Sequence, residues 1–152
     1  MNVALACDHA GRALYELARR VLSERGHQVL DLAPPPGDRV DYPEFALKVA
    51  HALVGGRADR GILICGTGIG MSIAANKVAG IRAGLVHDAF TARMTRAHND
   101  ANILCLGERV IGPGVAEECI TLFLDTPFEG GRHAERLTHI RAAERAEQTE
   151  HT

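Results

Sequence analysis

The chain has 152 residues, of which 46% are hydrophobic and 24% are charged, as expected of one soluble globular domain. The formal net charge of −2 and the aromatic content of 4% argue against a nucleic-acid partner, which requires a basic surface or aromatic rings that stack on bases. No run of 18 apolar residues and no leader pattern occurs, so we expect a cytoplasmic protein that does not enter a membrane.

The first third of the chain predicts two strands and two helices. Residues 2–7 are an apolar run typical of a buried strand, and residues 12–25 carry the spaced apolar side chains of an amphipathic helix. Residues 28–32 return to a strand. The proline-rich segment 33–41 is expected to be a loop, because proline sustains neither a helix nor a strand ladder. A second helical pattern follows at 45–53.

The rest of the chain repeats this alternation. The predicted elements are a strand at 61–65, a helix at about 68–78, a strand at 81–86, a helix from Asp88 to about Ala97, a strand at 102–106, a helix that begins near Pro113 and a polar helix that frays beyond Ala143. Several strands are apolar throughout, which is typical of a parallel sheet covered on both faces. We therefore predict a single doubly wound α/β domain over residues 1–152, with a mainly parallel sheet of about five strands.

The cysteines and histidines show no metal-binding spacing. The eight histidines form no HExxH or HxxxH pair, and the cysteines form no CxxC pair. The cysteines are Cys7, Cys65, Cys105 and Cys119. We expect reduced thiols, no disulfide and no bound metal.

One segment, GILICGTGIGMS at residues 61–72, leaves a predicted strand through Cys65 and enters a helix. The turn contains three alternating glycines, Gly66, Gly68 and Gly70. Glycines let the backbone approach a ligand closely, and their N–H groups can hold an oxyanion. A helix N-terminus also favours the thiolate form of a nearby cysteine. Together with the Thr67 hydroxyl, Cys65 is thus a candidate base beside an oxyanion stabiliser.

Three other interpretations of this segment remain open. A cysteine at the end of a strand can simply pack in the core, and a glycine-rich turn can be tight without holding a ligand. A dinucleotide site is a third possibility, but the last glycine of the GxGxxG fingerprint is replaced here by Met71.

Asp8 and His9 directly follow the first predicted strand. Ligands of doubly wound folds bind beyond the carboxyl ends of the strands. A carboxylate beside an imidazole could transfer protons there, or bind a sugar hydroxyl and an anion. The structural alternative is that Asp8 caps the first helix.

Two pairs in the second half of the chain are further candidates. His98 and Asn99 follow a predicted helix, although polar residues also commonly end helices. Arg132 and Arg136 have the i, i+4 spacing that places two side chains on one side of a helix. That spacing suits a phosphate clamp or a solvated helix face.

Taken together, five segments resemble the ribose-5-phosphate isomerase B family, which includes galactose-6-phosphate isomerase subunits. The segments are ACDHAG, DYPEFA, GILICGTGIGMSIAANKVAGIRA, HNDANILCLGERVIG and FEGGRHAERL, and they occur in the family's order over about residues 2–143. The resemblance implies a Rossmann-like fold and a homodimer or homotetramer. It also implies cofactor-free interconversion of ribose 5-phosphate and ribulose 5-phosphate through a cis-enediol, as in the pentose phosphate pathway.

The resemblance also assigns roles to individual residues. It implies that Cys65 is the base, that Thr67 and the glycine turn stabilise the enediolate, and that His98 assists ring opening with Asp8 near the sugar. Some family members carry a glutamate one residue after the turn instead of the cysteine; Met71 stands there, so the thiol must act. The implied substrate-binding residues are His9, Tyr42, Gly66, Gly68, Gly70, Asn99, Arg109, Arg132 and Arg136.

The position of His98 along the chain predicts a site shared between subunits. Cys65 and Asp8 end strands, whereas His98 precedes one, so it belongs at the opposite edge of a parallel sheet. We therefore expect His98 to reach the site of a neighbouring subunit.

The substrate remains open within the same reaction class. A tetrose, allose or galactose phosphate is the alternative to ribose 5-phosphate, and a nucleotide-binding module is the alternative from another class. The segment Pro34–Pro36 departs from the family pattern and is expected near the sugar pocket, where it would affect the preferred chain length.

Overall fold

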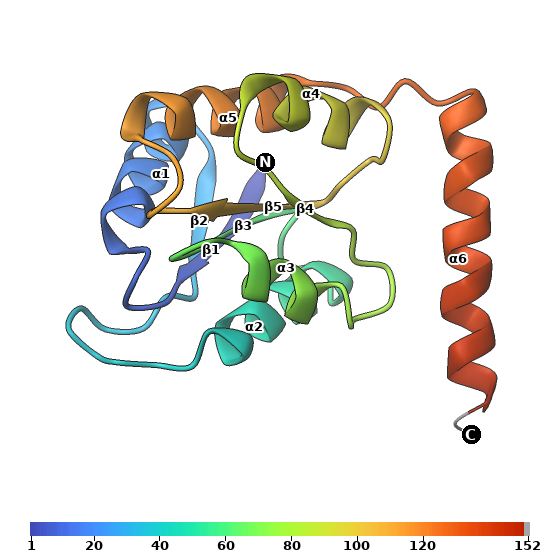
Figure 1. The fold of residues 1–152 in the computed structure, drawn as a ribbon, viewed down its shortest axis with the longest axis horizontal. Coiled ribbons are helices and arrows are strands. Elements are labelled where there is room, and N and C mark those ends of the chain that lie inside the picture. Colours follow the sequence, from blue (N-terminus) through green and yellow to red (C-terminus); the bar gives the residue numbers. More distant parts are fainter. Residues whose placement is uncertain (151–152) are drawn as a thin grey trace.

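Five parallel strands form one sheet in the order β2-β1-β3-β5-β4 (Figure 1). The structure is a computed structural model that describes residues 1–150. The strands are β1 (Asn2–Cys7), β2 (Gln28–Asp31), β3 (Arg60–Cys65), β4 (Ala83–Leu85) and β5 (Ile103–Gly107). The helices are α1 (Arg12–Glu24), α2 (Tyr42–Val54), α3 (Ile69–Ala75), α4 (Ala89–Ala97), α5 (Pro113–Asp125) and α6 (Arg132–Glu150). The prediction of a doubly wound, parallel α/β fold is confirmed.

Helices cover both faces of the sheet. In Figure 1, α1, α4 and α5 lie above the sheet and α2 and α3 lie below it. Successive strand residues point to opposite faces, so Val3 and Leu5 pack toward α1 and α5 while Ala4 and Ala6 pack toward α2 and α3. All four side chains are fully buried. This two-sided burial is the reason that the strands are apolar without polar alternation.

The first helix is capped from a distant part of the chain. Its N-cap is Gly11, which has no side chain to accept a hydrogen bond. Instead, the N–H of Leu14 donates to Glu108 Oε2 over 3.0 Å. Asp8 accepts from the N–H of Ala10, outside the helix, so the interpretation of Asp8 as the N-cap is wrong. Asp8 therefore does not cap α1, and its carboxylate remains a candidate for ligand binding at the end of β1.

The last helix stands beside the α/β body, next to the β4 end of the sheet (Figure 1). It runs to Glu150, beyond Ala143, where the sequence predicted fraying; residues 151 and 152 lie outside the described residues. A groove of about 620 Å³ between this helix and the sheet is lined partly by Gly84, Asn99 and Ile140. Across residues 1–150, no helix has both the length and the apolar character needed to span a membrane.

Candidate active site

The central strands of the sheet are β1, β3 and β5. Their carboxyl ends bring together a first group of predicted site residues, which includes Asp8, Cys65 and Arg109. In the parallel register, Cys7 pairs with Ile64 and Cys65 pairs with Gly107. Asp8 continues this register beyond β1, where its N–H donates to the Ile64 carbonyl over 3.1 Å. Asp8 and Cys65 therefore lie at the same edge of adjacent strands. This is the edge at which ligands of doubly wound folds bind.

The Cys65 side chain is held inside the glycine turn. The N–H of Gly68 donates to Cys65 Sγ over 3.1 Å, and only 5% of Cys65 is exposed. Gly68 has φ +77°, in the left-handed region that side chains rarely adopt. A Cβ atom at Gly68 would also lie 2.7 Å from the Leu85 side chain. The glycine thus permits the turn that aims an N–H at the sulfur.

The same turn presents further hydrogen-bond donors. The N–H groups of Gly66, Thr67 and Gly70 have no hydrogen-bond acceptor among residues 1–150. The exposed Thr67 side chain accepts from the N–H of Ile69 over 3.2 Å, which leaves its hydroxyl proton available. Donors beside a base are the arrangement that stabilises an oxyanion formed by proton abstraction.

Two larger side chains lie against the glycines of the turn. A Cβ atom at Gly70 would lie 2.5 Å from the Tyr42 ring, and one at Gly66 would lie 3.4 Å from the Arg109 guanidinium. Tyr42 comes from the start of α2, and Arg109 follows β5. The structure thus places both residues against the glycine turn that follows Cys65. His9, which is exposed, follows Asp8 at the same edge.

The other cysteines have the surroundings of core residues. Burial raises the pKa of the Cys7 and Cys119 thiols to about 11 and raises that of Cys105 further. These three thiols are protonated at neutral pH and show no exposed surface. Cys65 is the cysteine with both a hydrogen bond from a turn N–H and a position at the ligand-binding edge.

The second group of predicted residues lies at the opposite edge of the sheet. His98 ends α4 and precedes β5, whereas Cys65 pairs with Gly107 at the far end of β5. Four residue steps of about 3.3 Å along β5 separate the two edges by roughly 13 Å. Within one subunit, the structure does not bring His98 and Cys65 together.

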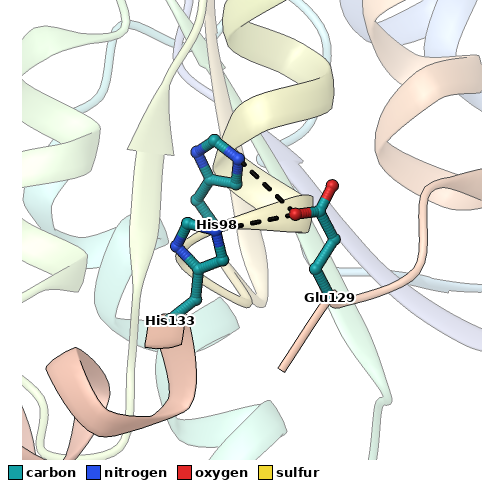
Figure 2. Close-up of side chains that lie close together, drawn as sticks. All are labelled: His98, Glu129 and His133. Atoms are coloured by element: carbon teal, nitrogen blue, oxygen red, sulfur yellow. Dashed lines mark ion pairs between the residues drawn. The ribbon is translucent and has the colours of Figure 1, made fainter. Parts of the chain in front are cut away.

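Figure 2 shows that His98 belongs to a cluster with two residues that the sequence analysis missed. Its ring stacks on the His133 ring with a centroid distance of 4.0 Å and an interplanar angle of 11°. Glu129 faces both rings, with Oε2 at 3.7 Å from His98 Nε2 and at 3.5 Å from His133 Nε2. His133 is buried, with 4% of its surface exposed. It adjoins Arg132, so the cluster joins His98 to the predicted phosphate clamp at the start of α6.

An ion-pair network fixes the loop that carries His98 and Asn99. Asp100 has φ +45°, and its carboxylate accepts from Arg82 over 3.0 Å and from Arg96 over 2.9 Å. Arg96 is buried, with 6% of its surface exposed. A buried arginine that is paired in this way holds the backbone in one conformation. His98 and Asn99 therefore lie on a rigid loop, although both also end the helix as the structural interpretation expected.

The sequence carried a weak signal for the two missed residues. Glu129 and His133 are four positions apart in FEGGRHAERL, but α6 begins only at Arg132, so helical spacing does not relate them. Their contact with His98 depends on how the segment before α6 passes the end of α4, where the N–H of Glu129 donates to the Ala97 carbonyl.

Comparisons with known proteins point to one family of enzymes. The family model "Ribose/Galactose Isomerase" matches residues 3–140. The chain is 46% identical to ribose-5-phosphate isomerase B of Escherichia coli over 94% of this chain and 96% of that protein. It is 43% identical to D-erythrulose-4-phosphate isomerase of Pectobacterium atrosepticum, over 92% and 93%.

Solved structures include a close match in fold. Ribose-5-phosphate isomerase B of Clostridium thermocellum has a TM-score of 0.94 and 48% identity, covering 96% of this chain and 99% of that one. The family model covers most of the chain, and the relatives match over nearly their whole lengths. The chain therefore belongs to the ribose/galactose isomerase family and is a sugar-phosphate isomerase.

Proposed function

We propose that this enzyme interconverts ribose 5-phosphate and ribulose 5-phosphate through a cis-enediol, with Cys65 as the base. The observation that carries the proposal is the hydrogen bond from the Gly68 N–H to Cys65 Sγ, in a turn where the N–H groups of Gly66, Thr67 and Gly70 have no acceptor among residues 1–150. A thiolate there can take the proton from C2 of the open-chain aldose and return it to C1. The charge that develops on the carbonyl oxygen would be stabilised by the turn N–H groups and Thr67.

The two groups of residues support a site shared between subunits. Cys65, Asp8, Tyr42 and Arg109 would come from one subunit, with His98, Asn99, Arg132 and Arg136 from its partner, as a two-fold dimer allows. The exposed side of α3 also supports an assembly. Ile69 and Ile73 lie one turn apart on α3 and are 49% and 56% exposed, and neighbouring exposed apolar side chains are typical of protein interfaces.

A panel of aldose phosphates tests the substrate. We expect the highest kcat/KM with ribose 5-phosphate, measured as ketose formed without added metal or cofactor. A four-carbon aldose phosphate is the main competitor, because a relative with 43% identity is a D-erythrulose-4-phosphate isomerase. The Pro34–Pro36 loop is expected to affect the preferred chain length of the sugar. Its position is fixed by Arg12, whose Nη1 donates to the Pro34 carbonyl over 3.0 Å. A higher kcat/KM with the four-carbon aldose phosphate would show that ribose 5-phosphate is not the preferred substrate, while the reaction would still be aldose–ketose isomerisation.

Loss of either clamp arginine should act on the phosphate end of the substrate. We expect Arg132→Ala or Arg136→Ala to lower kcat/KM for the sugar phosphate by about 10–100-fold, the worth of one charge-assisted hydrogen bond. The unphosphorylated sugar should be affected much less. Arg141→Ala, further along the same helix, is the control and should change neither value. Equal losses on both sugars would mean that the two arginines only support the helix.

A further inference from the structure

The cluster of His98, Glu129 and His133 is arranged around one carboxylate oxygen. Glu129 Oε2 lies within 3.7 Å of the Nε2 atom of both rings (Figure 2). An ionised carboxylate only accepts hydrogen bonds, so it is stabilised by N–H groups and repelled by nitrogen lone pairs. Each neutral imidazole is therefore favoured in the tautomer that carries its proton on Nε2.

The same donor atoms lie within 4.8 Å of one another, close enough to consider a metal site. Zinc ligands direct their lone pairs at one ion from tetrahedral directions. The lone pair of an imidazole lies in the ring plane, and the two rings are only 11° from parallel. Their lone pairs cannot converge on one ion in this geometry, so the cluster fits a carboxylate with two N–H donors better than a metal.

We propose that Glu129 and His133 are positioning residues that hold His98 as the Nε2–H tautomer, with the lone pair of Nδ1 available for opening the sugar ring. The inference rests on the proposed isomerase function and deepens it. In Figure 2, the other ring nitrogen of His98 points away from Glu129. Nδ1 takes the proton of the anomeric hydroxyl, and the released electron pair forms the C1 carbonyl. The bond from C1 to the ring oxygen breaks, and that oxygen takes the proton back from Nδ1.

The charges around His98 explain why both partners are needed. Ring opening makes His98 transiently cationic, and the carboxylate of Glu129 stabilises that cation, as in other carboxylate–imidazole pairs. Arg132 and Arg136 of α6 are positively charged, so they destabilise the His98 cation. Burial, followed by the nearby His98 and Arg132, lowers the pKa of His133. His133 therefore stays neutral and adds no further positive charge while its stacked ring fixes the plane of His98.

The test separates ring opening from proton transfer between the carbons. Ribulose 5-phosphate cannot close a five-membered ring, because its terminal oxygen carries the phosphate. Exchange of solvent deuterium into its C1 position therefore needs the base but not ring opening. For Glu129→Gln we expect conversion of cyclic ribose 5-phosphate to slow by at least about tenfold, part of the 10²–10⁴ that general acid–base catalysis contributes. Deuterium exchange into the ketose should stay within about twofold of the wild-type rate.

Controls make each outcome decisive. Glu135→Gln changes the same residue type in the first turn of α6 and should leave both rates unchanged. Equal slowing of both reactions by Glu129→Gln, or no slowing of either, would overturn the positioning role while leaving the isomerase function intact. A wild-type rate that falls with a chelator and returns with zinc would also overturn it, because a metal would occupy the Nε2 lone pairs. If wild-type protein catalyses neither reaction, the proposed function itself fails.

Discussion

Cys65→Ala is expected to abolish isomerisation while substrate binding stays within a few-fold of wild type. The thiol would act in proton transfer and contribute little to holding the substrate, so its loss falls on kcat. Removing a general base costs on the order of 10²–10⁴ in rate. The measurement is kcat with ribose 5-phosphate, together with the dissociation constant of the ketose for the inactive variant.

Two further variants separate the base from its surroundings. Cys65→Ser keeps the size of the side chain and an acceptor for the Gly68 N–H, but a hydroxyl ionises far less readily than a thiol, so this variant should be as inactive as Cys65→Ala. Cys119→Ala removes a fully buried thiol of α5 and should lose stability without losing kcat. Near-normal turnover in either Cys65 variant would remove the thiol from the mechanism.

The fold could be predicted from the sequence because local patterns and tertiary packing agree. The apolar runs became β1, β3 and β5, and the Asp88 side chain caps α4 by accepting from the Thr91 N–H over 2.7 Å. The strand predicted at 81–86 is shorter, since β4 spans Ala83–Leu85 at the edge of the sheet and pairs only with β5. Apolar character alone does not reveal how many residues of an edge strand find a partner.

The candidate site could be predicted only where strand ends define it. Cys65 and Asp8 follow buried strands, so a parallel sheet brings them to one edge whatever the details of the loops. The cap of α1 by Glu108 joins residues 94 positions apart, and the contact of Glu129 with His98 joins two loops. Such contacts depend on the path of irregular backbone, which no periodicity in the sequence encodes.

The separation of His98 from Cys65 leads to the second large effect, which is recovery of activity by mixing two inactive proteins. Cys65→Ala damages the group at the carboxyl edge, and His98→Ala damages the group at the opposite edge. If a site combines one group from each subunit, a hybrid dimer contains one site in which both groups are intact. After joint unfolding and reassembly, half of the random dimers are hybrids with one intact site of two, so about a quarter of wild-type activity should return.

A second mixture shows whether such recovery reports a shared site. Cys65→Ala mixed with Asp8→Asn combines two damaged groups at the same edge, so every hybrid site lacks one essential residue and the mixture should stay inactive. Recovery in this control would mean that reassembly restores activity for another reason. If the Cys65→Ala and His98→Ala mixture stays inactive although hybrids form, the subunits do not share sites. His98 would then have to reach Cys65 within its own subunit. That requires the loop fixed by Asp100, Arg82 and Arg96 to cross about 13 Å of sheet, which the partly buried ion pairs oppose.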